Sequence, residues 1–213
     1  MDTNGNFINT HNVFSLLLKH LIENRKMSDL NNGVAKTFNL TRLIEKQCAK
    51  YKLKLFETPI GFKHIANLIL KGEILMGGEE SGGYGVSTHL PERDGVFNTL
   101  LLLELMAIEK KGLREILNNI MNELGYYYYD RMDVHTEKAQ EVVKKLHSTP
   151  PHKLGEMKIT KTEDLDGIKL NFEDESWILF RASGTEPLLR IYAEAHSVKA
   201  VEQLLAEGHK LIS

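Results

Sequence analysis

Residues 53–76 have the sequence LKLFETPIGFKHIANLILKGEILM, and this stretch decides the fold of the first half of the chain. Two short apolar segments, Leu53–Phe56 and Glu73–Met76, lie on either side of a helical pattern that follows Gly61. The apolar face of this pattern consists of Ile65, Leu68 and Ile69. A strand, a helix and a second strand of these lengths are typical of layered α/β domains with parallel strands.

The same alternation continues upstream of this unit. A helical pattern begins at Asn9 or Thr10, both good helix caps. A short strand at residues 33–38 and a helix that Thr41 opens are expected to follow it. Residues 1–125 are therefore expected to form a layered α/β domain with a mixed, largely parallel sheet.

Downstream of the unit, a glycine-rich loop from Gly77 to Gly85 precedes a long helix. Asp94 is expected to cap this helix, which continues through Lys110. Its face is nearly all apolar and includes Val96, Phe97, Leu100, Leu101, Leu103 and Leu105. A helix that is apolar on almost every side is usually covered by other elements, so we expect this one to be buried.

The pattern changes after Gly112, where strands begin to cluster. Helices are expected at 113–124, at 136–147 and after Ser197, and strands at 126–134, 157–160, 168–172, 177–180 and 188–195. Residues 126–213 are therefore expected to form a smaller α+β domain, in which an antiparallel sheet carries helices on one face.

Composition and charge exclude several classes of protein. The net charge is −2, with acidic and basic residues mixed along the chain, so there is no electrostatic footprint for nucleic acid. The most apolar stretch, near Leu100–Ala107, is too short to span a bilayer, and the N-terminus lacks the features of a signal peptide. Cys48 is the only cysteine, so no internal disulfide can form. We therefore expect a cytoplasmic protein without a nucleic-acid or membrane partner.

The segment Arg181-Ala-Ser-Gly-Thr-Glu-Pro187 collects anion-binding groups between two expected strands. Arg181 supplies a rigid fork of N–H donors. Ser183 and Thr185 supply hydroxyls, and Gly184 allows backbone N–H groups to approach a ligand closely. A phosphate monoester would satisfy all of these donors at once.

Arg190 extends this set of donors. It alternates with apolar neighbours in the strand that follows, so its side chain points away from the core and could reach the same anion. The alternative interpretation is a surface turn in which Arg181 pairs with Glu186, a contact of little energetic value.

A second polar segment, Gly77-Gly-Glu-Glu-Ser-Gly-Gly83, follows an expected strand, at the sheet edge where α/β proteins usually bind ligands. Its carboxylates and hydroxyl suit a sugar, because one carboxylate can accept hydrogen bonds from two neighbouring hydroxyl groups. The spacing fits neither a dinucleotide-binding loop nor a Walker A loop. The alternative interpretation is a mobile glycine loop without a ligand.

Together and in this order, the two segments resemble the α-D-phosphohexomutase superfamily, which includes phosphoglucomutases, phosphomannomutases and phosphoglucosamine mutases. Thr58-Pro-Ile-Gly-Phe-Lys63 and Glu92-Arg-Asp-Gly95 match further stretches of the family pattern, and the resemblance covers essentially the whole chain. Family members have four domains around one cleft. This chain resembles the third domain, which recognises the sugar, and the fourth, which holds the phosphate.

The resemblance implies roles for individual residues. Glu79 and Ser81 would hold the sugar hydroxyls. His89, Arg93 and Lys63 would lie near the substrate. The phosphate that is not transferred would be bound by Arg181, Ser183, Gly184, Thr185 and Arg190. The resemblance leans towards a glucose or mannose phosphate as the substrate.

The resemblance also implies a reaction, in which a phosphoryl group moves between positions 1 and 6 of a hexose through a phosphoserine and a bisphosphorylated sugar. The family's nucleophile loop, Thr-Ala-Ser-His-Asn-Pro, and its metal-binding run, Asp-x-Asp-x-Asp-Arg, have no match in this sequence. Asp164-Leu-Asp166 comes nearest to the metal run but lacks the third carboxylate and the arginine. We therefore expect no catalytic residue, metal site or cofactor here, Mg²⁺ in a full-length enzyme, and no mutase activity of this chain alone.

The first residues of the chain lead to a prediction about its partners. Asp2-Thr-Asn-Gly5-Asn6 is a hairpin-type turn with a single residue before it, and in the resembled family the metal loop comes just before such a hairpin. We expect the partners to be a hexose phosphate and the N-terminal domains of the same protein. The alternative is a stand-alone, non-catalytic phosphosugar-binding module. A nucleic-acid binder is disfavoured by the charge balance.

Overall fold

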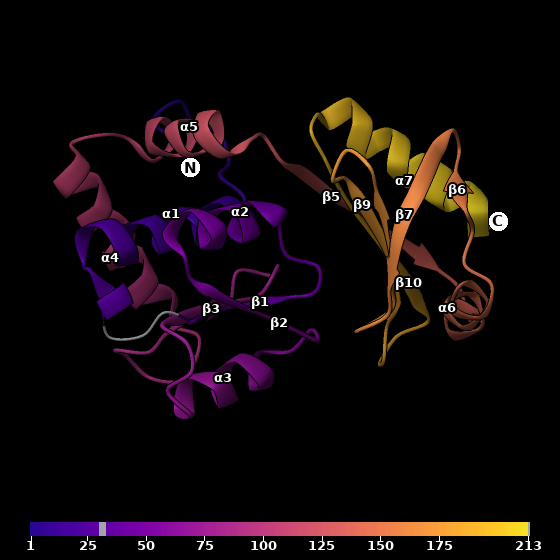
Figure 1. Ribbon diagram of the computed structural model, residues 1–213, viewed down its shortest axis with the longest axis horizontal. Helices are drawn as coiled ribbons and strands as arrows, with labels where there is room; N and C mark the ends of the chain where they lie inside the picture. Colours follow the sequence, from indigo (N-terminus) through magenta and orange to yellow (C-terminus); the bar gives the residue numbers. More distant parts are fainter. Residues whose placement is uncertain (30–32, 213) are drawn as a thin grey trace. The chain divides into compact units, whose positions relative to one another are not determined.

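The computed structural model describes residues 1–29 and 33–212, which divide into two compact units, Met1–Gly125 and Tyr126–Ser213 (Figure 1). Each unit has a sheet of its own, with four strands in the first and six in the second. The expected combination of a layered α/β fold followed by an α+β fold is confirmed.

The sheet of the first unit has the strand order β2-β1-β3-β4. The central strand β1 (Gly33–Thr37) runs parallel to both β2 (Lys54–Thr58) and β3 (Met76–Gly78). The edge strand β4 (Tyr84–Val86) is antiparallel to β3. This is the mixed, largely parallel sheet that the sequence predicts, and its parallel strands share one carboxyl edge.

Helices cover both faces of this sheet (Figure 1). They are α1 (Thr10–Lys19), a π-helix (His20–Asn24), a 3₁₀ helix (Met27–Asp29), α2 (Arg42–Tyr51), α3 (Phe62–Leu70), α4 (Gly95–Glu109) and α5 (Leu113–Leu124). On one face, Val34 and Met76 pack with Leu17 and Ile44 from α1 and α2. On the other face, Ala35 packs against α3.

The helices of the first unit begin where the sequence places their caps. The Asn9 side chain accepts a hydrogen bond from the backbone N–H of Asn12, which sets the start of α1. Thr41 caps α2 in the same way. Asp94 caps α4 by accepting from the N–H of Phe97 at 2.9 Å.

The glycine-rich region differs from its prediction as a single loop from Gly77 to Gly85. Gly77 and Gly78 belong to β3, and β4 was missed altogether. A Cβ atom on Gly77 would lie 2.5 Å from Ile65 and 3.1 Å from the Ala35 side chain. Gly77 therefore allows β3 to pack tightly against α3. From the sequence alone, neighbouring glycines favour the prediction of a loop.

The prediction that α4 is buried is wrong. Only Asn98, Leu101 and Leu105 of this helix are buried, while Val96 and Leu100 keep exposed fractions of 75% and 58%. Within the residues that the structure describes, no helix is both long enough and apolar enough to cross a membrane.

The second unit is built on one antiparallel sheet with the order β5-β10-β9-β8-β7-β6. Its strands are β5 (Tyr128–His135), β6 (Lys153–Leu154), β7 (Met157–Glu163), β8 (Ile168–Phe172), β9 (Trp177–Ala182) and β10 (Leu188–Ala195), and its helices are α6 (Ala139–Ser148) and α7 (Val198–Ile212). The Ser197 hydroxyl accepts from the N–H of Ala200, as expected of a cap. The two-residue strand β6 was not predicted.

Both helices of the second unit pack on one face of its sheet, as predicted. Alternate strand residues such as Phe180 and Ile191 form a single core with Leu146 of α6 and Leu204 of α7. The opposite face is polar and aromatic. On that face the buried Trp177 indole donates to the Glu194 carboxylate at 3.0 Å.

Candidate functional site

The loop between β3 and β4 is held in place by hydrogen bonds. The N–H of Glu79 donates to the carbonyl of Gly83 at 3.0 Å, and the N–H of Gly82 donates back to the carbonyl of Glu79 at 3.1 Å. The Thr10 hydroxyl, at the start of α1, donates to the carbonyl of Glu80 at 2.5 Å. These contacts fix the loop at the carboxyl edge of the sheet and disagree with the alternative of a mobile glycine loop.

The carboxylate of Glu79 lies beneath this loop. Its side chain is 9% exposed, an Arg93 nitrogen lies 3.6 Å away, and the backbone N–H of Gly61 donates to it. Burial raises the pKa of Glu79, and the Arg93 guanidinium opposes this rise. A Cβ atom on Gly83 would overlap the Arg93 side chain and approach Glu79, so a larger residue there would displace Arg93 from its present position.

His89 and Arg93 both lie close to Asp94, the cap of α4. The His89 imidazole lies 2.7 Å from the Asp94 carboxylate and stacks on Phe97, with 4.1 Å between ring centroids. Hydrogen bonds from the Phe97 N–H and from His89 lower the pKa of Asp94. Of the other predicted residues, Ser81 is exposed on the loop and Lys63 is exposed in the first turn of α3.

Some residues of this region were not predicted. The Asn39 amide donates to the Glu80 carboxylate at 3.4 Å, just beyond β1. Thr37 and Thr58 face each other at the carboxyl ends of β1 and β2, with buried hydroxyls that have no hydrogen-bond partner among the described residues. All three follow or end parallel strands, which is the signal that could have identified them.

In the second unit, two arginines face each other across neighbouring strands. Arg181 of β9 and Arg190 of β10 are directly paired in the antiparallel register. Like charges opposite one another are destabilising, because their Cβ atoms lie only about 4.5–5.5 Å apart. Asp166 binds Arg181 at 2.9 Å and Glu186 binds Arg190 at 3.2 Å. The alternative interpretation was a surface turn in which Arg181 pairs with Glu186. In the structure Arg181 pairs with Asp166, and Glu186 pairs with Arg190.

These acidic groups leave part of the arginine pair unsatisfied. The Nε atom of Arg190 is buried and has no hydrogen-bond partner in the described part of the chain. Such a donor is costly unless an acceptor reaches it. The geometry can therefore accept an additional anion between or beside the two guanidinium groups.

The hairpin between these strands supplies the other predicted groups. The N–H of buried Ser183 donates to the carbonyl of Leu188 at 2.8 Å, and the N–H of Thr185 lies 3.4 Å from the Ser183 hydroxyl. A Cβ atom on Gly184 would meet nothing within 4 Å. The protein itself thus leaves open space beside Gly184, large enough for a group outside the chain to approach its backbone.

The acidic residues nearest in sequence to a metal-binding run have cationic partners. Asp164 lies 2.9 Å from His147, and Asp166 binds Arg181. Across residues 1–29 and 33–212, no group of three or more histidine, cysteine or acidic side chains is arranged to hold a metal ion. The expectation that Mg²⁺ serves a full-length enzyme stays a prediction.

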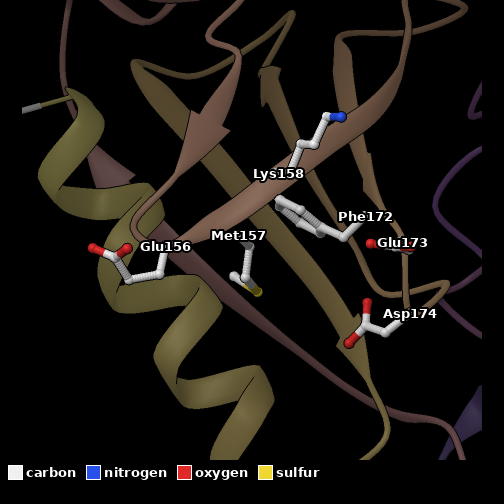
Figure 2. Close-up of a pocket in the computed structure, with 6 residues that line it drawn as sticks. All are labelled: Glu156, Met157, Lys158, Phe172, Glu173 and Asp174. Carbon is white, nitrogen blue, oxygen red and sulfur yellow. The ribbon is translucent and has the colours of Figure 1, made fainter.

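A pocket of about 360 Å³ lies elsewhere on the second unit, between β7 and the end of β8 (Figure 2). Met157 and Phe172 lie among charged side chains there, and the full lining is Glu156, Met157, Lys158, Phe172, Glu173 and Asp174. None of the residues predicted to bind substrate lines this pocket.

Comparison with known proteins gives consistent matches over both units. Residues 9–124 match the family model described as phosphoglucomutase/phosphomannomutase, alpha/beta/alpha domain III. Residues 133–209 match the C-terminal domain of the same family.

Individual relatives align with 80–100% of the chain but are much longer. A phosphoglucomutase/phosphomannomutase of Thermococcus kodakarensis is 30% identical over 100% of this chain and 44% of its own length. A phosphoglucosamine/phosphogalactosamine mutase of Sulfurisphaera tokodaii is 31% identical over 80% of this chain and 36% of its own. The open form of a Paramecium phosphoglucomutase, parafusin, superposes with a TM-score of 0.77 at 25% identity, covering 96% of this chain and 41% of that one. The chain thus spans less than half the length of these relatives.

Proposed function

Because this chain belongs to the phosphoglucomutase/phosphomannomutase family, in which it matches domain III and the C-terminal domain, we propose that it supplies substrate recognition for a hexose phosphate mutase. The full enzyme would interconvert hexose 1-phosphate and hexose 6-phosphate through a phosphoserine and a bisphosphorylated sugar. The first unit would bind the sugar and the second would bind the phosphate that is not being transferred.

The observation that carries this proposal is the directly opposed pair Arg181 and Arg190. Two guanidinium groups at one cross-strand position repel each other, and Asp166 and Glu186 each contact only one of them. A phosphate dianion fits, because its several oxygens can accept from both arginines and from the Ser183 and Thr185 groups of the hairpin. The buried Nε of Arg190 would then gain the acceptor that it lacks among the described residues.

The sugar would bind at the loop after β3. The Glu79 carboxylate would accept from two neighbouring hydroxyls, with Ser81 and His89 beside it and with Lys63 at the start of α3. Arg93 would keep Glu79 ionised in its buried position. We propose glucose or mannose phosphate as the substrate, and the amino-sugar specificity named for the Sulfurisphaera relative is the nearest competitor.

This chain would bind and orient the substrate without performing the chemistry. Phosphoryl transfer requires a positioned nucleophile and neutralisation of charge on the transferred group. In the full enzyme, Mg²⁺ would supply that neutralisation from outside this chain. We expect no mutase activity from residues 1–213 alone, and the measurement is conversion of glucose 1-phosphate in the presence of Mg²⁺ and a bisphosphate activator.

The binding proposal can be tested by following backbone amide shifts of the chain during titration with glucose 6-phosphate, mannose 6-phosphate and glucosamine 6-phosphate. We expect shifts in residues 78–83 and 181–190, and the strongest response from the preferred sugar. Inorganic phosphate should shift only the second of these segments, since it lacks the hydroxyls that Glu79 would recognise.

Arg190→Gln should abolish the response of residues 181–190, because it removes one charge and the Nε donor. Lys161→Gln provides the control, since Lys161 lies on β7 of the same sheet and pairs with Glu163 instead. Unshifted amides in both segments at millimolar ligand would overturn the proposal.

A further inference from the structure

The helix α4 exposes a continuous apolar stripe on one side. Residues 96, 100, 103 and 107 recur at spacings of four, three and four, so they share one face of a helix with 3.6 residues per turn. Val96, Leu100 and Leu103 have exposed fractions of 75%, 58% and 55%, and Ala107 is also exposed. Leu101 and Leu105 are buried on the opposite side of the helix, and Leu101 belongs to the core of the first unit.

The stripe is more than a scattering of apolar residues on a surface. Isolated exposed leucines are common, but a contiguous apolar patch marks a site where another surface binds. Glu104 is the one charged residue between Val96 and Ala107, and it lies at the edge of the stripe, where its carboxylate contacts His20 and Arg25. An open hollow of about 560 Å³ lies at its N-terminal end, lined by Arg93, Asp94, Gly95, Val96, Thr99 and Leu100, and could receive a protruding side chain.

We infer that this stripe, defined by Val96, Leu100, Leu103 and Ala107, is the docking surface for the first two domains of a phosphohexomutase. The inference rests on the proposed function, because it takes its partner from the family. The chain matches domain III and the C-terminal domain, and it spans 44% of the Thermococcus relative. More than half of that relative's length lies outside the match, which leaves room for domains other than the two matched here.

The position of the stripe favours this occupant over a second copy of the chain. Asp94, the cap of α4, lies next to Arg93 and contacts His89 of the candidate sugar site. A domain that covers the stripe would therefore lie beside the bound sugar, where the family requires its nucleophile and metal to reach. Interfaces between domains of one chain bury roughly 600–1,500 Å² and have an apolar centre, which this stripe can provide.

Thiol labelling can test the inference, because the only native cysteine, Cys48, is 2% exposed. Leu103→Cys would be prepared in the chain alone and in a chimera that joins the first two domains of the Thermococcus relative to residue 1. The rate of reaction with a maleimide would be measured for each, with the labelled residue identified by mass spectrometry. We expect labelling to slow by about tenfold or more in the chimera, since a covered site reacts only when the interface opens.

Leu70→Cys is the matched control, because Leu70 is 71% exposed on α3 and lies outside the stripe. It should react equally fast in both proteins. Slow labelling of Cys48 in the chimera shows that the first unit is folded there. If Cys48 reacts rapidly in the chimera, the first unit is not folded there, and the test uses the intact Thermococcus relative instead. A cysteine is then placed at the position aligned with Leu103, and slow labelling is expected.

Two results would overturn the inference. One is equally fast labelling of Leu103→Cys with and without the added domains, or at the aligned position of the intact relative. The other is slow, concentration-dependent labelling in the chain alone, which would mean that a second copy covers the stripe. Sugar-dependent amide shifts together with unprotected Leu103→Cys would refute only this inference and leave the proposed function standing.

Discussion

Single side chains set the chemistry of the candidate phosphate site. Asp133, Arg190 and Arg181 occupy one row across β5, β10 and β9, and Asp166 continues it beside Arg181. The two central positive charges are thus flanked by two negative ones. The negative charges reduce the repulsion between the two arginines in the absence of a ligand. They leave guanidinium N–H donors available for a phosphate.

Gly184→Ala tests whether the hairpin backbone approaches a ligand. A methyl group at this position meets nothing within 4 Å, so the variant should fold normally. If phosphate binds against this backbone, the methyl group should weaken its affinity by about tenfold, equivalent to about 1.4 kcal/mol. Isothermal titration with glucose 6-phosphate measures the change. Gly112→Ala, in the first unit, should leave the affinity unchanged, and equal affinities for all three proteins would exclude the close approach.

His11 should make the first unit sensitive to acid. Burial and, to a lesser extent, the charge of Lys36 together lower the pKa of His11 from 6.5 to about 3. Between these values the unfolded chain takes up a proton that the folded chain cannot, so stability present above pH 6.5 is lost as the pH falls towards 3. The expected slope is about 1.4 kcal/mol for each pH unit.

The measurement for His11 is urea unfolding followed by circular dichroism across this range. His11→Gln should show a shallower fall in unfolding free energy than the wild-type chain, whatever its stability at neutral pH. Carboxylates with lowered pKa values, such as Asp2 and Glu163, act equally in both proteins and cancel in the difference. Parallel curves for the two proteins would contradict the assignment.

The sequence could identify the chemical groups of the candidate sites but not their partners. Glu79, Arg181 and Arg190 belong to short motifs, so their positions follow from the sequence alone. Asp166 lies fifteen positions from Arg181, and Thr10 lies seventy positions from Glu80. Contacts at such separations depend on the register of strands and on packing, which local patterns do not encode.

At the scale of elements, α1 acts as a support for the candidate sugar loop. Its cap, Asn9, fixes the first turn, and Thr10 in that turn holds the carbonyl of Glu80. The Tyr84 hydroxyl donates in turn to the carbonyl of Thr10 at 2.6 Å. The start of one helix therefore determines how firmly a loop about seventy residues away is held.

Asn9→Ala should destabilise both α1 and the loop. Loss of a cap costs about 1 kcal/mol, whereas Asn9→Asp should preserve the cap because aspartate is equally effective there. Native-state hydrogen exchange is the suitable measurement. We expect the amides of α1 and of Glu79 and Gly82 to exchange about five times faster in the alanine variant. Faster exchange in α1 alone would show that the loop does not depend on this helix.

The elements that the sequence failed to predict share a physical cause. β4 and β6 have three and two residues, too few for an alternating pattern to emerge. β3 contains Gly77 and Gly78, which usually favour loops, and the close approach of Ile65 to Gly77 and of Tyr84 to Gly78 explains them. α4 was expected to be buried because its composition is that of a buried helix. In the structure only Asn98, Leu101 and Leu105 of this helix are buried, so an apolar composition did not predict which of its sides is covered.

At the scale of the whole molecule, each unit has its own core. The core of the first unit is formed by residues such as Phe14 and Ile65, on the two faces of its sheet, and that of the second by residues such as Phe180 and Leu204. That residues 1–125 and 126–213 are separate domains, each able to fold alone, remains a prediction.

Residues 126–213 should fold when expressed alone, because a core of their own is what an independent domain requires. The measurements are amide dispersion in a nitrogen–proton correlation spectrum and cooperative thermal unfolding by circular dichroism. The fragment should reproduce the phosphate-induced shifts of residues 181–190. A spectrum without dispersion would show that this unit requires the first for its structure.

The polar face of the second sheet has a practical consequence. Trp177 is the only tryptophan of the chain, its indole is buried and bound to Glu194, and the Tyr129 ring lies 6.4 Å away. Tyrosines so close pass absorbed light to an indole, whose emission colour changes when water reaches it. The second unit therefore carries an intrinsic fluorescent label at a known position, and changes confined to it can be followed optically without attaching a dye.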